Sequence, residues 1–468
     1  MTLPNREQYE PATTTATVVR RAAAHAEAYL SGLPDRSVAP TATYAETLAA
    51  LDLPLPAGPT EPLDVLDALV EAADPGLAGT GSGRFFGYVI GGVLPAAAGA
   101  ELMTGIWDQN AAFASLAPAA SAVEEVAARW SLELLGLPAG ASVGFTTGTM
   151  TANITTLAAA RHHVLAAVGW NVAEDGLAGA PPVRIVVGAQ RHVTVDAALR
   201  LLGFGSRLVV VDADDQGRMQ PAGLVAALAA GDGPAVVVSQ AGEVNTGAVD
   251  PLREICETAR AHGAWVHIDG AFGLWAGASP ARRHLIDGVE LADSWAADAH
   301  KWLNTPYDCG LAIVADPAAH AAATAAPGAA YLPDQQSRER DPFAWTPEFS
   351  RRARGFAVYA ALRSLGRDGV ADLVERSCAH ARRFAERLAA LPGAQVLNDV
   401  VLNQVLIRFG DDDATTDAVM ARVRASGEAF MSGTTWHGRS AMRISVTNWT
   451  TTTEDVDRTV EAIEKALG

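Results

Sequence analysis

Two charged residues stand where predicted strands end. Lys301 lies in the segment Asp298-Ala-His-Lys-Trp302, between an expected strand and a turn. Asp269 closes the apolar run Trp265-Val-His-Ile-Asp269, and the small residues Gly270 and Ala271 follow it. Burying one lysine and one aspartate at strand ends costs free energy unless the two share a ligand. The pair therefore indicates a bound group that needs both an amine and a carboxylate.

Pyridoxal 5'-phosphate has these requirements. Its aldehyde needs a lysine amine to form a Schiff base, and its pyridine nitrogen needs a carboxylate that keeps it protonated. Its phosphate needs small residues and free N–H groups at a helix start. The polar, small-residue turn Phe145–Asn153 supplies this last element, because it runs into a predicted helix over 154–162. His192 follows the predicted strand Val183–Val187 and is placed to stack on a planar cofactor; a helix cap or surface position is the alternative.

These segments together resemble a known family. His300-Lys301-Trp302, Asp269-Gly270-Ala271, Thr147-Gly148-Thr149 and His192 are similar to the group II pyridoxal-phosphate-dependent amino-acid decarboxylases, over about residues 60–468 and in the same order. The family has fold type I and includes aromatic-amino-acid, histidine and glutamate decarboxylases. The resemblance implies decarboxylation of a small-molecule substrate, an L-amino acid, to its amine, with pyridoxal 5'-phosphate as cofactor and a homodimer as the assembly.

The resemblance also implies a role for each matching residue. Lys301 is the expected Schiff-base lysine, Asp269 the partner of the pyridinium nitrogen, and His192 the ring that stacks on the cofactor. The remaining expected contacts are with the phosphate, the ring face or the substrate, and they are assigned to Gly148, Thr149, Ala271, Asn245 and His300. Lys301, His192 and His300 are the expected catalytic residues.

The sequence departs from the family at a mobile loop. That loop usually carries a tyrosine thought to protonate the carbanion left after carbon dioxide departs. The corresponding stretch here is Tyr331–Arg354, and alignment through Trp345 puts Pro342 or Phe343 where the tyrosine should be; Tyr331 lies nearby but too early in the sequence. Without it, oxidative deamination to an aldehyde, transamination or carbon–carbon lyase chemistry becomes an alternative outcome.

Arg443 and Tyr88 are expected to bind substrate. Arg443-Ile-Ser445 resembles an Arg-x-Ser with which related aminotransferases and lyases hold the α-carboxylate. An inward Arg443 would stabilise that carboxylate and favour a reaction that retains it, aldolase-like or transaminating; an outward arginine on an edge strand is the alternative. Tyr88 lies in Arg84–Gly92, which matches the family's substrate pocket, and its glycines either leave room for substrate or serve a tight turn.

The elements around these residues predict an α/β protein. Between about 120 and 315, apolar β-branched runs alternate with helical patterns, which is typical of a mainly parallel sheet covered on both faces. Ligands of such sheets bind beyond the carboxyl ends of the strands. We expect a large domain with a fold-type I, seven-stranded type of sheet and a small C-terminal α+β domain. Its last helix is predicted to open with a capping box, Thr451 and Glu454.

Three regions follow from this pattern. Residues 1–60 are an N-terminal arm, 61–330 the large cofactor-binding domain, and 331–468 a mobile loop with the small domain. Residues 316–350 show little periodicity and are predicted to form a loop.

Composition narrows the classes of binding partner and the cellular compartment that we expect for this protein. The chain has 468 residues, 49% of them hydrophobic, and a formal net charge of −18. This charge argues against nucleic acid and against an anionic membrane surface as partners. Cys256, Cys309 and Cys378 are widely spaced, which favours a reducing cytoplasm. The acidic run at 411–413 is expected to be a solvated turn, so no metal site is predicted.

Overall fold

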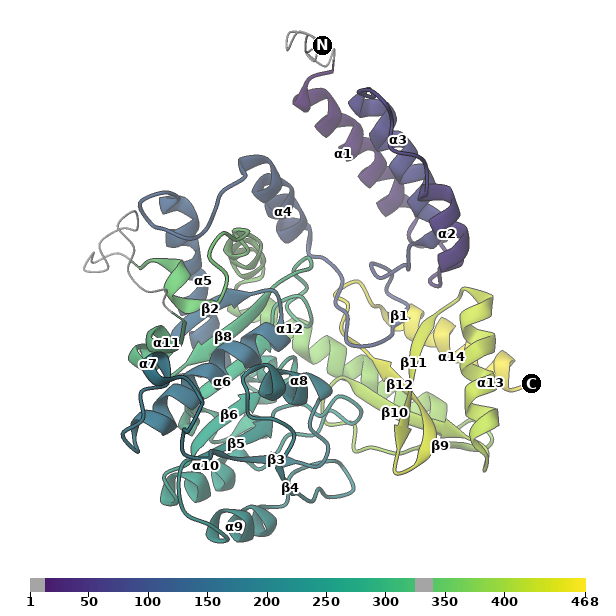
Figure 1. Ribbon diagram of the computed structural model, residues 1–468. Helices are drawn as coiled ribbons and strands as arrows, with labels where there is room; N and C mark the ends of the chain where they lie inside the picture. The colour runs from purple at the N-terminus through teal and green to yellow at the C-terminus, as the bar shows by residue number, and fades with distance from the viewer. Residues whose placement is uncertain (1–12, 325–339) are drawn as a thin grey trace, which may run out of the picture.

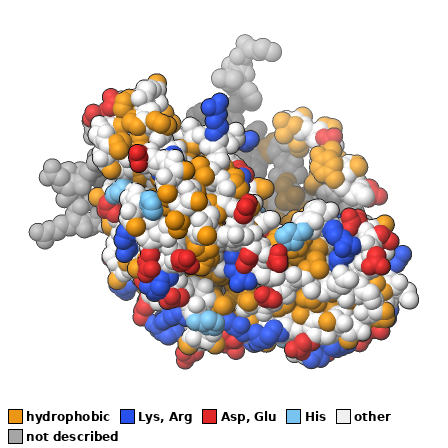
Figure 2. Space-filling model, turned by 90° about the horizontal axis from the view of Figure 1, so that it is seen from below, with side chains coloured by type: hydrophobic (Ala, Val, Ile, Leu, Met, Phe, Trp, Pro, Cys, Tyr) orange, Lys and Arg blue, Asp and Glu red, His pale blue; other side chains and the backbone are white. Residues whose placement is uncertain are grey.

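A computed structural model describes residues 13–324 and 340–468. Figure 1 shows two sheets, one in a large domain and one in a smaller C-terminal domain, with three N-terminal helices grouped apart from the large domain. Within the described ranges, no helix is both long and apolar enough to cross a bilayer. On the face shown in Figure 2, acidic and basic side chains are interspersed, so this face presents no single basic surface to a phosphate backbone.

The large domain is built on a seven-stranded sheet. Its strands lie in the order β2 (Ser142–Thr146), β8 (Gly310–Val314), β7 (Ser294–Asp298), β6 (Trp265–Asp269), β5 (Ala235–Gln240), β3 (Arg184–Gly188) and β4 (Val209–Val211). Only β8 runs antiparallel to its neighbours. Every residue of β2, β6, β7 and β8 is buried, as expected of strands covered on both faces. This arrangement confirms the predicted fold class.

Helices cover both faces of this sheet (Figure 1). The helices of the large domain are α4 (Pro95–Trp107), α5 (Pro118–Leu135), α6 (Thr149–Ala166), α7 (Val172–Asp175), α8 (Val193–Leu201), α9 (Pro221–Ala229), α10 (Leu252–Ala261) and α11 (Pro317–Thr324). Short 3₁₀ turns η2 (Gly273–Ala278), η3 (Arg283–Ile286), η4 (Val289–Leu291) and η5 (Pro342–Trp345) link them. The loop predicted over 316–350 is therefore partly wrong: α11 lies in it, because its alanine-rich sequence favours a helix.

The small domain contains five strands and two helices. Its strands lie in the order β1 (Phe85–Phe86), β11 (Phe430–Trp436), β12 (Arg439–Ser445), β10 (Gln404–Phe409) and β9 (Ala394–Val396), with α13 (Asp413–Ser426) and α14 (Thr453–Leu467). The capping box of α14 forms one residue later than predicted, between Thr452 and Asp455. The predicted box was wrong because two neighbouring threonines fit the same pattern, and the later one has an aspartate three residues on.

One long helix joins the two domains. Helix α12 (Gly355–Ala389) is kinked at Gly366, whose φ of 63° interrupts the helical backbone. The N-terminal arm consists of α1 (Thr15–Gly32), α2 (Tyr44–Leu51) and α3 (Pro62–Ala73), and η1 (Asp74–Gly76) follows it.

Candidate active site

The predicted site residues gather at the carboxyl edge of the large sheet. Gly148 and Thr149 follow β2, His192 follows β3, and Asp269 is the last residue of β6. Asp298 is the last residue of β7, so His300 and Lys301 come directly after it. Because parallel strands end at one edge, four segments far apart in sequence meet there.

These segments enclose a cavity of about 240 Å³. Seven of its lining residues were predicted from the sequence: Gly148, Thr149, His192, Asp269, Ala271, His300 and Lys301. Seven others were not assigned a role: Met150, Thr194, Gln240, Gly242, Val244, Phe272 and Asp298. These seven predicted residues are therefore brought together around one space of the size of a small ligand.

Asp298 is the most informative of the unassigned residues. Its side chain is only 3% exposed, and Oδ2 lies 2.9 Å from Lys301 Nζ. Its Oδ1 accepts a hydrogen bond of 2.7 Å from the backbone N–H of Thr149, in the first turn of α6. One buried carboxylate thus holds both the lysine and the helix start. The sequence feature that could have identified Asp298 is its position, three residues before Lys301.

His300 lies beside the same carboxylate. Its Nε2 is 3.6 Å from Asp298 Oδ2, and its Nδ1 accepts the backbone N–H of Cys309. The ring of Tyr307, itself more than half exposed, lies 4.4 Å from the His300 ring, centre to centre. Burial lowers the pKa of His300, which favours a neutral ring.

Asp269 and His192 line the same cavity. Asp269 Oδ2 accepts a hydrogen bond of 3.1 Å from the Asn153 amide, and Oδ1 accepts the backbone N–H of Ala271. His192 caps α8, and its Nδ1 lies 2.8 Å from the hydroxyl of Thr194. Burial lowers the pKa of His192, so this ring also favours the neutral form that can lie against an aromatic cofactor.

The residues present fit pyridoxal 5'-phosphate. The hydroxyl of Thr149 is buried at the start of α6 and has no hydrogen-bond partner, which leaves it for a phosphate oxygen. A Cβ on Gly148 would approach His300 Cε1 to 3.2 Å, so glycine keeps this turn open. Lys301 and Asp269 supply the amine and the carboxylate at the same cavity. Lys301 would hold the aldehyde end, and Asp269 the ring nitrogen.

Asn245 lies outside this lining. Its amide nitrogen donates to Glu243 Oε1 at 2.8 Å, and its oxygen accepts from the Thr434 hydroxyl at 2.9 Å. Glu243 is buried and also accepts the backbone N–H of Asn245 and Thr246. The Asn245 side chain therefore joins the loop after β5 to the small domain.

Arg443 and Tyr88 meet each other in the small domain. Arg443 is 8% exposed, and its Nη2 lies 3.4 Å from the carbonyl oxygen of Tyr88. Ser445 and Ser432 also bind the Tyr88 backbone, each at 2.5 Å. Arg443 is thus turned inward, toward the backbone of the 84–92 segment, and neither residue is among those that line the cavity.

The glycines near Tyr88 serve close packing. A Cβ on Gly91 would lie 2.1 Å from the carbonyl oxygen of Lys301, and one on Gly92 would lie 2.4 Å from Asn448 Oδ1. The space that these glycines provide is therefore filled by the backbone at Lys301 and by the small domain. The reading that they leave room for substrate is wrong at these two positions.

The position predicted to replace the loop tyrosine is packed into the large domain. Tyr331 lies outside the described residues. Pro342 and Phe343 are buried, and the Phe343 ring lies 5.2 Å from that of Phe113 and 5.4 Å from that of Phe349. Just before them, Arg340 binds Glu124 and the carbonyl of Val143. In the described part of this loop, the aromatic side chain is therefore held in a hydrophobic cluster.

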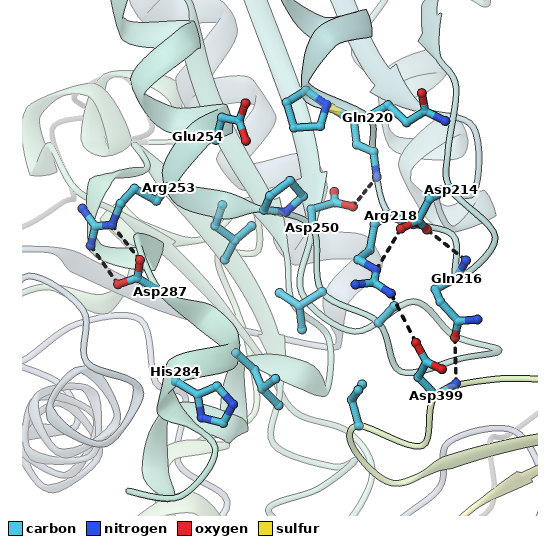
Figure 3. Close-up of a pocket in the computed structure, with 18 of the residues that line it drawn as sticks. Asp214, Gln216, Arg218, Gln220, Asp250, Arg253, Glu254, His284, Asp287 and Asp399 are labelled. Atoms are coloured by element: carbon cyan, nitrogen blue, oxygen red, sulfur yellow. Dashed lines mark hydrogen bonds and ion pairs between the residues drawn. The ribbon is translucent and has the colours of Figure 1, made fainter.

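A larger cavity, of about 740 Å³, lies away from these residues. Figure 3 shows ion pairs on the two arginines of its lining, Arg218 and Arg253, and none on Glu254 or His284. Arg218 lies between Asp214 and Asp399, and Arg253 binds Asp287 at 2.7 Å. Both arginines that line this cavity are therefore already neutralised by carboxylates.

Comparison with known proteins agrees with the geometry. Residues 46–409 match the pyridoxal-dependent decarboxylase conserved domain. L-2,4-diaminobutyrate decarboxylase of Rhizobium meliloti (strain 1021) is 31% identical over 76% of this chain and 71% of its own. 4-Hydroxyphenylacetaldehyde synthase of Rhodiola rosea is 29% identical over 68% of this chain and 67% of its own.

Solved structures show the same fold. The Oryza sativa TDC structure with PLP and tryptamine superposes with a TM-score of 0.90 at 23% identity, over 98% of this chain and 99% of that one. The Rhodiola rosea synthase structure superposes with a TM-score of 0.86 at 25% identity, over 97% and 98%. The family match spans most of the chain, and a cavity at its sheet edge joins a lysine, a carboxylate and a helix start. The chain therefore belongs to the pyridoxal-dependent decarboxylase family, whose members decarboxylate amino acids with pyridoxal 5'-phosphate.

Proposed function

We propose that this decarboxylase converts an L-amino acid to its amine, with Lys301 as the residue that carries the cofactor. The observation that supports this proposal most strongly is that one cavity is lined by Lys301, Asp269, His192 and Thr149. When bound, pyridoxal 5'-phosphate accepts electrons from the substrate's α-carbon, so that the carboxylate can leave as carbon dioxide.

Each of these residues has one task in the proposal. Thr149, at the start of α6, and the close turn at Gly148 bind the phosphate. Asp269 places a negative charge at the ring nitrogen and keeps that nitrogen protonated. His192 lies on one face of the ring, and the small Ala271 side chain permits approach on the other. Asp298 keeps Lys301 Nζ inside the cavity, at 2.9 Å.

The described part of the loop supports a second candidate outcome. Pro342 and Phe343 stand where the family's proton-donating tyrosine is expected, and neither carries an acidic proton. One similar protein is an aldehyde synthase. An aldehyde product needs molecular oxygen: amino acid, oxygen and water give aldehyde, carbon dioxide, ammonia and hydrogen peroxide. The inward position of Arg443 favours the other alternative, a reaction that retains the substrate's carboxylate.

Product analysis separates these outcomes. The holoenzyme is incubated with pooled L-amino acids, with and without oxygen, and carbon dioxide, amine, aldehyde and peroxide are quantified. We expect carbon dioxide and amine in equal amounts, independent of oxygen. Oxygen-dependent aldehyde and peroxide would replace the amine proposal with oxidative deamination. A keto acid without carbon dioxide would contradict both.

We further propose that the protein is a homodimer. In the described part of the arm, α1, α2 and α3 contain no buried residue, although Leu30, Leu48 and Leu69 are apolar. Exposed apolar side chains also form a stripe on α4, namely Leu102, Met103, Ile106 and Trp107. Helices with this much uncovered apolar surface are stabilised by a partner, and a second copy of the chain is the partner that the family implies.

Light scattering tests the dimer. We expect a mass of twice 48.6 kDa for the wild-type protein. Ile106→Glu places a charge in the stripe and is expected to weaken association by at least about tenfold. Val168→Glu, at a site exposed to a similar degree just after α6, is the control and should leave the mass unchanged. A wild-type monomer at micromolar concentration would contradict the proposal.

The cysteines support a cytoplasmic location, which we also propose. Cys256, Cys309 and Cys378 are all buried as free thiols. Free thiols persist in a reducing compartment.

A further inference from the structure

We propose that Trp265, Ser294, His267 and Asn153 form a hydrogen-bonded chain that positions Asp269 and stabilises its negative charge. None of the four is among the residues that line the cavity. They would act on the cofactor through Asp269, as positioning residues. The inference rests on the proposed function in one respect, because it takes Asp269 to face the ring nitrogen.

The chain consists of four consecutive contacts. Trp265 Nε1 lies 2.9 Å from Ser294 Oγ, and Ser294 Oγ lies 3.0 Å from His267 Nδ1. His267 Nε2 lies 2.9 Å from Asn153 Oδ1. Asn153 Nδ2 lies 3.1 Å from Asp269 Oδ2. Every link is within hydrogen-bonding distance, and the chain ends on the carboxylate.

The chemistry of the groups fixes the direction of every link. An ionised carboxylate only accepts, so Asn153 donates its amide N–H to Asp269 and turns its oxygen to His267. His267 Nε2 must then carry the proton. Its Nδ1 is left to accept the Ser294 hydroxyl, and Ser294 accepts the indole N–H of Trp265. All four donors therefore point toward Asp269.

Burial makes this arrangement stable against protonation. Asn153, His267 and Ser294 are fully buried, and Trp265 is 4% exposed. Burial lowers the pKa of His267 to about 3, so its ring stays neutral and can donate at one nitrogen while accepting at the other. In a buried setting, hydrogen bonds that share one direction polarise one another and strengthen the last link.

The titratable groups near these four residues lie at the two ends of the hydrogen-bonded chain. Asp293 accepts the backbone N–H of Val266, and the His163 ring lies 5.0 Å from the Trp265 ring. At the other end, His192 shares the cavity with Asp269, together with Asp298, His300 and Lys301. His267 is thus flanked by Asn153 and Ser294, which are both uncharged.

Strand geometry explains how the sequence builds the chain. Trp265, His267 and Asp269 alternate along β6, so their side chains project from one face of the sheet. Ser294 is paired with His267 in the register of β6 and β7. Helix α6 packs on β6 and provides Asn153. A strand buried on both faces would otherwise be apolar at these positions, so the two polar residues, His267 and Asp269, reflect a function beyond packing.

The test measures the pH at which the ring nitrogen of the cofactor loses its proton. Wild-type protein and variants are loaded with pyridoxal 5'-phosphate labelled with ¹⁵N in its ring, and the nitrogen signal is followed against pH. Asn153→Leu removes the donor to Asp269 and is expected to lower the pH at which the nitrogen loses its proton by about one to two units. His267→Phe should give a smaller shift in the same direction, and Ser294→Ala a smaller one again.

His320 provides a matched control. It is also buried and bonded to a serine, with its Nδ1 2.8 Å from Ser142 Oγ, and burial likewise lowers its pKa to about 3. Ser142, however, begins β2, at the sheet edge opposite the cavity. His320→Phe should leave the nitrogen signal unchanged. Equal midpoints in wild type, Asn153→Leu and Ser294→Ala would overturn the proposal.

A second measurement needs no cofactor and no substitution. In the cofactor-free wild-type protein, ¹⁵N spectra of histidine are expected to show His267 neutral between pH 5 and 9, with its proton on Nε2. A proton on Nδ1 would reverse the hydrogen bond between His267 and Ser294 and would overturn the inference. This result does not depend on the His267 and Asn153 variants, so it decides the question even if they fail to fold. If instead the ¹⁵N titration of the loaded wild-type protein shows no effect of a neighbouring acidic group on the ring nitrogen, the proposed role of Asp269 fails. The hydrogen-bonded chain itself would then still stand.

Discussion

Replacing Lys301 with alanine is expected to abolish carbon dioxide release, by at least about 10⁴-fold, because the amine that carries the cofactor is lost. The loss should be chemical rather than structural. Asp298, which contacts Lys301 Nζ, keeps its hydrogen bond from the Thr149 N–H and its position beside His300. We expect cofactor to enter the cavity of the variant through its phosphate contacts and to be removed by dialysis.

The chain offers an unusually clean control for this experiment. It contains two lysines in all, Lys301 and Lys465. Lys465 lies in the last turn of α14, in the small domain. Reduction of the holoenzyme with borohydride should attach the cofactor to the peptide that contains Lys301 and leave the Lys465 peptide unmodified. Lys465→Arg should retain full activity. Labelling of Lys465, or activity in Lys301→Ala, would contradict the assignment.

The strand ends explain why much of the site was predictable. Apolar runs such as Trp265–Asp269 and Ala235–Ser239 are dense enough in β-branched and aromatic residues to identify buried strands. In a parallel sheet, residues that follow such runs meet at one edge. Lys301, Asp269 and His192 therefore converge without any knowledge of the loops between them.

Elements with weaker local signals were missed. β2 reads Ser-Val-Gly-Phe-Thr, and its glycine is required because the carbonyl oxygen of Trp345 packs where a Cβ would lie. β1 has two residues, and it is a strand only because β11 pairs with it in parallel, far away in sequence. Such pairings depend on the assembled domain, so no local pattern specifies them.

The supporting polar residues were missed for a related reason. Asn153 and Ser294 look like ordinary polar residues in a helix and a strand, and their importance appears only when α6 and β7 pack on β6. Asp298 was visible as a neighbour of Lys301, but its bond to the Thr149 N–H joins segments 149 residues apart. The one available signal was the alternation of Trp265, His267 and Asp269 in a strand otherwise apolar.

Asp269→Asn is expected to lower the rate of decarboxylation by about 10³-fold. The carboxylate stabilises positive charge at the ring nitrogen, and that charge is what allows the ring to take up electrons from the substrate. An amide has nearly the same shape and no charge. The variant should therefore still bind the cofactor, through Thr149 and Lys301, while the ring nitrogen loses its proton near neutral pH.

Asp293 makes the comparison decisive, because it lies beside the other end of the same strand. It accepts the backbone N–H of Val266 at 2.7 Å, and burial raises its pKa, yet it is remote from the cavity lining. Asp293→Asn should cost stability, since an accepting oxygen pair becomes an amide, and should leave the cofactor spectrum unchanged. A ring nitrogen that stays protonated in Asp269→Asn, with the rate unaltered, would show that the charge beneath the ring comes from another residue.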